Sequence, residues 1–432
     1  MLGGFAAAAA GGTGLLLLPG ATERPGGASF IEALFTAVSA LCVTGLVVVD
    51  TPGHWSSFGE CVILVLIQIG GLGVMTTGAV IGLAVARRLS LRTRLTAAAE
   101  AGGGRPVNAP EVILGVLRIT VLTEAAVAVI LTLQFALTYG MPWDQASWYG
   151  VFHAVSAFNN AGFSLFSDNL AGFAADPVVC LSISAAVILG GLGFPVLMQL
   201  RRRPFTPLAW SLNTRLVLLG TGVLLAAGTL LVLLVESGNP RTLGPLNWPA
   251  RLLAAFFQSV QTRTAGFSSI NIAEMDPLSW LGMDLLMFIG GGPAGTAGGI
   301  KVTTFMVLIY VVAAELRGGA SVTMLGKRLG SQVPREAITM LLAAAALVLA
   351  ATGFLMAVTD FGLDVLLLET TSAFGTVGLS AGISAAIGPV GQSVLVVLMF
   401  VGRLGPLLLA AGLALRSRRS RVELPEERPI IG

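Results

Sequence analysis

The chain has 432 residues, 55% of them hydrophobic and only 11% charged, and a formal net charge of +3. Soluble globular domains carry about 25% charged residues, so this composition and the mean hydropathy of +0.87 exclude a soluble protein and indicate a chain embedded in a bilayer. The positions of the basic residues explain the small positive charge better than a nucleic-acid partner does, and we expect no nucleic acid.

Apolar segments long enough to cross a membrane, at about 20 residues each, recur along the whole chain. They cover roughly residues 1–19, 57–86, 112–138, 174–200, 213–235, 277–315, 334–358 and 388–415. The first segment has the length of a signal peptide, but no basic residues precede it, as they do in such peptides. We therefore predict eight membrane spans, the first of them included.

Between the spans lie four shorter apolar segments, each followed by a similar glycine loop. The loops are Cys42-Val43-Thr44-Gly45-Leu46, Asn160-Ala161-Gly162-Phe163, Thr264-Ala265-Gly266-Phe267 and Thr376-Val377-Gly378-Leu379. The segments before them, such as 29–41 and 147–158, are too short to cross a bilayer and are typical of half helices that dip in and return. Because the glycines recur at intervals of roughly a hundred residues, we predict four copies of one unit.

The predicted architecture is all-α, with four pseudo-symmetric units of helix, half helix, pore loop and helix. The units are residues 1–94, 95–204, 205–330 and 331–415, followed by a C-terminal tail, 416–432, on the cytoplasmic side. Non-helical backbone at membrane depth is tolerated only where it is buried in protein or lines water. Four such loops therefore favour a common central pore.

A second glycine motif follows each loop glycine after about 25 residues, at a similar distance in every unit. It comprises Gln68-Ile69-Gly70-Gly71-Leu72-Gly73, Leu189-Gly190-Gly191-Leu192-Gly193, Gly290-Gly291-Gly292-Pro293 and Val401-Gly402-Arg403-Leu404-Gly405. In three units we expect a brief step inside a helix. In the third unit the motif opens a glycine-rich stretch with a proline, residues 290–301, which will not hold a continuous helix.

We predict that the stretch 290–301 is unwound backbone that crosses the pore below the loops and acts as its gate. A loop of this composition is expected to have little to hold it in one conformation, so a bound partner can tip it between closed and open arrangements. The predicted gate residues are Gly290, Gly291, Gly292, Gly295, Gly298, Gly299, Lys301 and Arg403.

Most basic residues, 18 of the 25 Lys and Arg, fall in four segments: 87–105, 201–215, 317–335 and 416–428. By the positive-inside rule these segments are cytoplasmic, so both termini are expected inside a multi-pass protein of the cell (inner) membrane. The outward loops carry Asp50, Asp144, Asp168, Asp176, Glu236, Asp276 and Asp360. We expect an acidic outer mouth that concentrates cations, although ordinary solvated loop charge explains any one of these acids equally well.

A dehydrated cation needs oxygen ligands, which backbone carbonyls supply when the chain can turn them toward the pore axis. Glycine permits the left-handed conformations that this requires, and the half helix before it directs the negative end of its dipole to the centre. The predicted ion-binding filter is Val43, Thr44, Gly45, Asn160, Ala161, Gly162, Thr264, Ala265, Gly266, Thr376, Val377 and Gly378. The alternative is that the glycines only permit close helix packing.

Four charged residues within apolar segments need partners, because an unpaired charge at mid-bilayer costs at least about 2.5–3.5 kcal/mol. Arg403 is expected near the break at Gly291, as part of the gate or as a structural cap on its carbonyls. Arg263 is expected to bond pore-loop carbonyls or Glu369. Lys301 fits a gate and a scaffold equally, and for Glu124 we expect a polar contact between helices.

Other classes of protein fit less well. The stretch Gly295 to Thr303 does not match a phosphate-binding loop, and the two histidines, His54 and His153, provide no protease site. Cys42, Cys61 and Cys180 show no paired spacing and are interpreted as small core residues. We therefore expect no enzyme, and the main alternative is a secondary cation transporter with binding sites at broken helices.

The four loops, the glycine motifs and the ending Gly298-Gly299-Ile300-Lys301 resemble the KtrB/TrkH superfamily of potassium uptake proteins, closest to KtrB, over essentially the whole chain. The resemblance implies potassium in the filter, with sodium dependence as a less secure feature, and an arginine that helps to obstruct the pore. It also implies a homodimer on a cytoplasmic KtrA-type ring, where any nucleotide would bind, and no covalent cofactor. Arg201 to Arg203 and the cluster 416–421 are candidates for contacts with that ring or with anionic membrane lipid.

Overall fold

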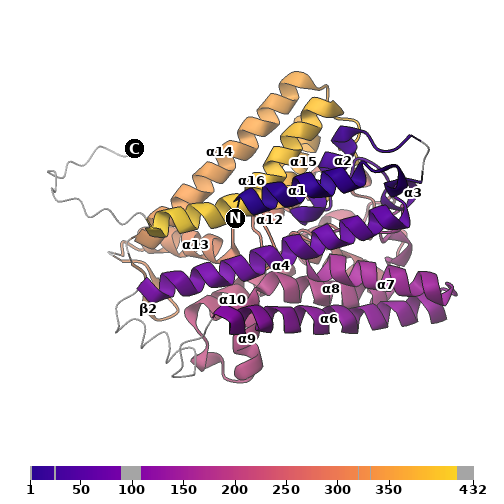
Figure 1. Ribbon diagram of the computed structural model, residues 1–432. Helices are drawn as coiled ribbons and strands as arrows, with labels where there is room; N and C mark the ends of the chain where they lie inside the picture. Colours follow the sequence, from indigo (N-terminus) through magenta and orange to yellow (C-terminus); the bar gives the residue numbers. More distant parts are fainter. Residues whose placement is uncertain (1, 24–25, 89–108, 320, 331, 416–432) are drawn as a thin grey trace.

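The computed structural model describes the chain except for residues 1, 24–25, 89–108, 320, 331 and 416–432 (Figure 1). The predicted tail 416–432 and most of the basic segment 87–105 therefore lie outside the described residues. In the described part of the chain, helices form nearly all regular structure, which confirms the all-α prediction. Two short strands, β1 (Thr323–Met324) and β2 (Lys327–Arg328), pair antiparallel in a small hairpin.

The helices in chain order are α1 (Leu2–Leu16), α2 (Phe30–Leu41), α3 (Thr51–His54), α4 (Ser57–Arg88), α6 (Ala109–Leu137), α7 (Trp143–Phe158), α8 (Pro177–Leu192), α9 (Phe194–Arg202), α10 (Leu212–Glu236), α11 (Trp248–Gln261), α12 (Pro277–Phe288), α13 (Val302–Leu316), α14 (Gln332–Val358), α15 (Leu363–Gly375) and α16 (Gly388–Leu415). Short 3-10 turns are η1 (Pro19–Ala21), η2 (Ala171–Phe173), η3 (Pro207–Ala209) and η4 (Ile272–Glu274). Figure 1 shows α4, α6 and α8 lying along roughly one common axis, with α14 at an angle to them.

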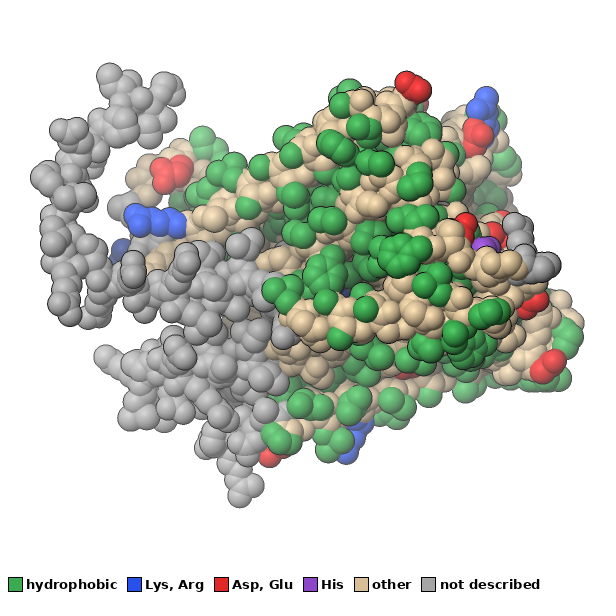
Figure 2. Space-filling model, turned by 45° about the horizontal axis from the view of Figure 1, so that its top comes forward, with side chains coloured by type: hydrophobic (Ala, Val, Ile, Leu, Met, Phe, Trp, Pro, Cys, Tyr) green, Lys and Arg blue, Asp and Glu red, His purple; other side chains and the backbone are tan. Residues whose placement is uncertain are grey.

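Within the described residues, five helices are long and apolar enough to cross a membrane alone: α4, α6, α10, α14 and α16. The other three predicted spans are helical in a shorter or broken form. The helix α1 has 15 residues, the pair α8 and α9 is bent by 102°, and the segment 277–315 is divided into α12 and α13. Figure 2 shows hydrophobic side chains over much of the surface between the two ends of the molecule, which suits contact with lipid.

The four half helices are α2, α7, α11 and α15, and their sequences explain where they begin. Ser29 and Glu32 form a reciprocal capping box at the start of α2, and the Asn247 side chain accepts from the amide of Ala250 at the start of α11. The helix α7 begins at Trp143, one turn before the predicted Ser147. All four half helices are buried over their last turns.

The acids of the outer loops differ in their surroundings. Asp176 caps α8 by accepting from the amides of Val178 and Val179. Burial acts to raise the pKa of its carboxyl, but hydrogen bonds from Gln134, Tyr139 and these amides outweigh burial and hold the pKa below its usual value. This acid therefore caps the start of a helix as well as adding negative charge to the end of the protein that is predicted to face outward.

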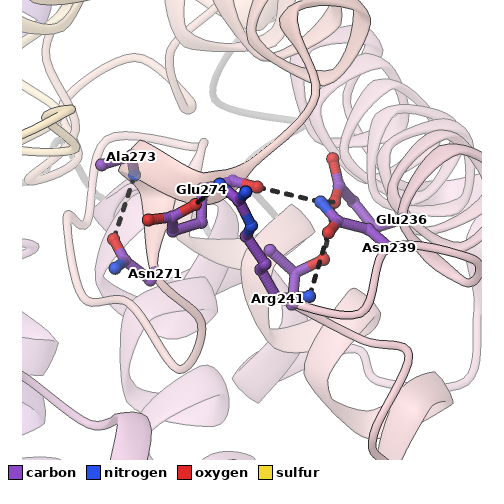
Figure 3. A network of polar contacts seen from close by, with 7 residues as sticks. Glu236, Asn239, Arg241, Asn271, Ala273 and Glu274 are labelled. Carbon is purple, nitrogen blue, oxygen red and sulfur yellow. Dashed lines mark hydrogen bonds and ion pairs between the residues drawn. The ribbon is translucent and has the colours of Figure 1, made fainter.

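Glu236 is an exception to the expected acidic mouth, because it is fully buried at the end of α10. One carboxylate oxygen accepts from Asn239 at 2.8 Å and from Thr242 at 2.6 Å, and the other accepts from the amide of Asp276 at 2.9 Å. Asn239 also donates to the backbone of Glu274, which extends the network in Figure 3. Glu236 ties α10 to the segment before α12, and its prediction as an open surface charge is wrong.

The cysteine prediction holds for two of the three residues. Cys42 and Cys180 are buried, whereas Cys61 is exposed on α4. In a chain that faces lipid, an apolar helix carries small apolar residues on its outer side as well as in the core, and the sequence does not distinguish the two sides. All three cysteines are free thiols.

Candidate functional site

Each half helix ends at one of the four predicted glycine loops, and all four loops share one backbone pattern. The residue two positions before the glycine has a positive φ in every loop, and so does the glycine itself. The values of φ are 48° at Val43, 59° at Asn160, 66° at Thr264, 50° at Thr376, 88° at Gly45, 69° at Gly162, 82° at Gly266 and 96° at Gly378. A positive φ is uncommon for residues other than glycine, so the same unusual shape at four places indicates a shared task.

The four glycines form a closed ring. A β-carbon added at Gly45 would lie under 3.0 Å from the carbonyl oxygen of Ala161. An added β-carbon would likewise lie under 3.0 Å from a carbonyl oxygen at the other three glycines. The carbonyl is that of Ala265 for Gly162, Val377 for Gly266 and Thr44 for Gly378. Each loop glycine therefore packs against the backbone of the next loop along the chain, and the glycine of the fourth loop packs against the first loop. Any side chain at these positions would collide with a neighbouring carbonyl.

The core closes in the same order as the ring. One hydrophobic cluster contains Leu41 of α2 together with Leu366 of α15 and Leu398 of α16, although these residues lie far apart in the sequence. The first and the fourth predicted units thus pack together around the loops. Residues Val43, Thr44, Ala161, Ala265 and Val377 are all buried beside the ring.

Serines in three half helices hold the loops in shape, and the sequence analysis did not identify them. The Ser39 hydroxyl accepts from the amide of Gly45 at 3.2 Å and donates to the carbonyl of Leu46 at 2.7 Å. Ser156 donates to the carbonyl of Phe163 at 2.9 Å. Ser372 accepts from the amide of Gly378 at 3.0 Å.

A repeated sequence could have revealed these serines. Ser39-Ala40, Ser156-Ala157 and Ser372-Ala373 stand at the same distance before their glycines. The third loop differs, because Ser259 is one residue out of register and donates to Leu225 instead. There the Gln261 side chain accepts from the amide of Phe267 at 3.3 Å.

The second glycine motif has a clear structural task. Added β-carbons at Gly70, Gly190 and Gly402 would lie under 3.0 Å from the carbonyls of Leu41, Phe158 and Phe374 respectively. These carbonyls belong to the last turn of the half helix in the same predicted unit. The motif therefore lets each half helix place its carbonyl end against the long helix beside it, close to the ring.

The stretch 290–301 is unwound, as predicted, between the end of α12 and the start of α13. The second unit, however, is also broken at its glycine motif, contrary to the expected brief step inside a helix. Gly193 has φ of 90° and separates α8 from α9. The expected step holds in α4, where Gly70 to Gly73 stay helical, and in α16.

The break in the second unit is followed by Pro195, which has no amide hydrogen to donate to the Gly191 carbonyl, and the stretch 290–301 pairs with the backbone groups left free. The amide of Gly292 donates to the carbonyl of Gly191 at 2.7 Å, and that of Thr296 to the carbonyl of Gly190 at 3.1 Å. In return the amide of Phe194 donates to the carbonyl of Ala294 at 3.2 Å. Backbone groups freed by the break are thus satisfied by the unwound stretch.

Two buried arginines add further anchors to this stretch. Arg403 donates to the carbonyl of Thr296, and Arg263 donates to the carbonyl of Gly290 at 3.0 Å. Lys301 donates to the carbonyl of Ala297 within the stretch. The expectation that the stretch has little to hold it in one conformation is therefore wrong.

The predicted partner Glu369 does not contact Arg263. Its carboxylate accepts from the hydroxyl groups of Ser380 and Ser384, so this buried acid is satisfied within its own predicted unit. Thr296 connects the stretch directly to the ring, because its hydroxyl donates to Asn160 at 2.9 Å. The stretch and the second loop are therefore one hydrogen-bonded assembly.

Glu124 makes the expected polar contact between helices. Its carboxylate accepts from Gln68 of α4 at 3.4 Å and from Asn159 at 3.0 Å. Asn159 directly precedes Asn160, so Gln68 of α4 and Glu124 of α6 both support the start of the second loop.

A cavity of about 450 Å³ lies beside the unwound stretch. Its lining includes Gly78 of α4, Gly295, Lys301, Ala344 of α14 and Arg403. The cavity is mostly apolar, with the two basic residues on its wall. It gives the stretch an open space on one side.

Comparisons with known proteins agree with this geometry. Residues 18–419 match the family model TrkH, described as a cation transport protein. The Ktr system potassium uptake protein B of Vibrio alginolyticus is 38% identical over 94% of this chain and 89% of its own length. The potassium/sodium uptake protein NtpJ of Enterococcus hirae is 32% identical over 98% of this chain and 94% of its own length.

A solved structure shares the fold. The potassium transporter TrkH from Vibrio parahaemolyticus matches with a TM-score of 0.73 over 95% of this chain and 83% of its own, at 19% sequence identity.

Proposed function

Because the chain belongs to the TrkH family of cation transport proteins, we propose that this multi-pass membrane protein carries potassium into the cell through the ring of four glycine loops. The observation that carries the proposal is the closed order of the ring, in which each glycine faces the carbonyl of the next loop. The relatives named as potassium uptake proteins support the choice of ion.

The ring would bind the ion through backbone carbonyls, which replace water around a dehydrated cation. Four half helices end at the ring, and the negative ends of their dipoles favour a cation there. Left-handed residues such as Asn160 and Thr264, together with the glycines, allow the loops to take this shape. The proposed filter comprises the twelve residues named from the sequence.

The stretch 290–301 would act as the gate. It lies next to the second and fourth loops: Thr296 contacts Asn160, and a β-carbon at Gly298 would meet the Thr376 side chain. Arg403 would hold the closed arrangement through the carbonyl of Thr296. The anchors on α8 and α9 imply that opening requires movement of these helices as well.

A regulatory partner is part of the proposal. Relatives carry the name Ktr system, which suits an assembly of several components. We infer a homodimer on a cytoplasmic nucleotide-binding ring of the KtrA type, docked near the connection between α13 and α14, where Arg317 and Arg328 are exposed. Sodium dependence is proposed on the name of the potassium/sodium uptake relative.

The rate of rubidium flux per molecule tests the function against the secondary-transporter alternative. We expect purified protein in liposomes to pass rubidium down its gradient at a rate that does not saturate at low turnover. Empty liposomes provide the control. Slow, saturable exchange that requires a second ion on the opposite side would contradict a pore.

Ser39→Ala is expected to weaken the first loop. It leaves the amide of Gly45 and the carbonyl of Leu46 without their shared partner, and an unsatisfied buried group costs about 1–3 kcal/mol. We expect a lower ratio of rubidium to sodium uptake and a lower thermal unfolding temperature. Ser393→Ala is the matched control, because that exposed hydroxyl bonds only the Pro389 carbonyl of its own helix. Equal uptake ratios in both variants would show that the serine does not shape the loop.

A further inference from the structure

Two large apolar side chains project from the segment that joins α9 to α10. Phe205 is 92% exposed and Leu208 is 90% exposed, on a chain segment that also exposes Arg201 and Arg203. Exposed apolar side chains next to arginines are typical of segments that enter the boundary between lipid headgroups and acyl chains. Full burial of each such side chain away from water is favourable, so insertion into lipid would stabilise the contact.

The segment has a fixed shape. The Trp210 ring nitrogen donates to the carbonyl of Arg203 at 2.8 Å, and the Arg215 side chain donates to the carbonyl of Pro207 at 3.0 Å. Gln199 of α9 accepts from the amide and the hydroxyl of Ser211. Phe205 and Leu208 are therefore held outward by the surrounding backbone.

The direction of α9 brings this segment to the membrane boundary. The bend of 102° at Gly193 turns α9 almost perpendicular to α8, and Figure 1 shows α9 lying across the direction of α6. If α8 follows the membrane normal, α9 lies close to the membrane plane. The apolar residues Val196 and Leu197 pack inward with α10 and α13, so the last residues of α9 and the segment after it are left to meet lipid.

The same helix is attached to the gate. The amide of Phe194, the first residue of α9, donates to the carbonyl of Ala294. A β-carbon at Gly193 would collide with the carbonyl of Pro293, so the two backbones are in direct contact. A force on the far end of α9 is therefore transmitted to the stretch 290–301 through bonded backbone.

We propose that residues 201–210 bind the anionic headgroups of the cytoplasmic leaflet, with Phe205 and Leu208 inserted below them, and that this anchor keeps the gate docked on α8 and α9. The arginines match the negative charge of that leaflet, and the segment connects two apolar helices at the basic side of the protein. The lipid contact rests on the geometry of the segment, whereas its effect on ion flux rests on the proposed function.

A spin label at position 205 tests the lipid contact without measuring transport. Phe205→Cys is made in a Cys61→Ala background, because Cys42 and Cys180 are buried. The labelled protein is placed in nanodiscs of phosphatidylcholine, with or without phosphatidylglycerol, and label depth is read from its accessibility to oxygen and to a water-soluble nickel reagent. We expect the label in the acyl region only when phosphatidylglycerol is present, and a shallow position when Arg201 and Arg203 are changed to Gln.

Rubidium flux tests the effect on the gate. In wild type we expect lower flux in vesicles with phosphatidylglycerol than in phosphatidylcholine alone, by about fivefold for each arginine engaged. Arg201→Gln with Arg203→Gln, and separately Phe205→Ser with Leu208→Ser, should remove this difference. Arg118→Gln with Arg335→Gln removes the same charge from two exposed positions on α6 and α14 and should retain it.

The outcomes separate the proposals. A label that stays in water with phosphatidylglycerol, or that is shielded only when a cytosolic regulatory protein is added, overturns the lipid contact. An inserted label with equal flux in both lipids overturns the link to the gate. Absence of rubidium flux from every variant in every lipid overturns the proposed function, while the label depth still decides the lipid contact.

Discussion

Gly45→Ser is expected to lower the ratio of rubidium to sodium uptake at least about tenfold, which corresponds to about 1.4 kcal/mol of lost discrimination. Gly45 has φ of 88°, and a β-carbon there would lie under 3.0 Å from the carbonyl of Ala161. The serine must therefore push the second loop outward and widen the ring. A wider ring holds carbonyls too far from a dehydrated potassium ion and loses its preference over sodium.

The measurement is competitive rubidium and sodium uptake in cells that lack other potassium importers. Gly353→Ser is a matched control, because Gly353 lies in α14 and a β-carbon there would meet nothing within 4 Å. The control should behave as wild type. If serine at Gly45, Gly162, Gly266 and Gly378 in turn leaves the ratio unchanged, the ring is not the filter and the glycines serve only helix packing.

Arg403→Ala is expected to raise rubidium flux in the absence of the regulatory partner by about tenfold or more, because a charge-assisted hydrogen bond contributes about 1.5–3 kcal/mol. The change removes the bond to the carbonyl of Thr296, and with it an anchor of the stretch 290–301. Ion selectivity should not change, because the hydrogen bond that is lost goes to a carbonyl of the stretch 290–301 and not to a loop carbonyl. Flux should also depend less on the partner.

Flux into proteoliposomes, with and without the partner, provides the measurement. Arg118→Ala is the control, since it removes an arginine from α6 that is exposed on the surface. Shortening the stretch by deleting Gly291 to Gly295 should act in the same direction. A fall in flux in both gate variants, with intact folding by gel filtration, would mean that the stretch is scaffold.

The elements that repeat along the chain were predictable from the sequence. The four loops, the half helices and the unwound stretch each follow from local composition, and the fourfold recurrence of Gly45 and its counterparts indicated a ring before any contact was known. The serines that bond the loops were equally visible, as Ser39-Ala40 and its two copies. A repeated serine has many structural uses, however, and its hydrogen bond to the loop depends on the folded path of the backbone after the half helix.

The features that the sequence did not reveal depend on contacts between predicted units. The break at Gly193 stands beside Pro195, which the sequence displays, whereas no proline follows the similar motif around Gly71, which remains helical. The pairing of the freed backbone groups with the stretch 290–301 is what the sequence does not display. Arg263 binds the carbonyl of Gly290 and not Glu369 for the same reason, since position in space decided the partner. Composition describes one segment at a time, so it cannot predict these pairings.

The closed ring of four different loops within one chain has a genetic consequence. In a pore built from identical subunits, one altered codon changes the loop of every subunit at once. In this chain it changes a single loop and leaves the other three as they were. The third loop already differs, because there the Gln261 side chain accepts from the amide of Phe267, whereas Ser39 and Ser372 accept from the amides of the loop glycines. If the ring is the proposed filter, its ion preference can therefore be changed in small inherited steps, each of which alters one loop and leaves the other three intact.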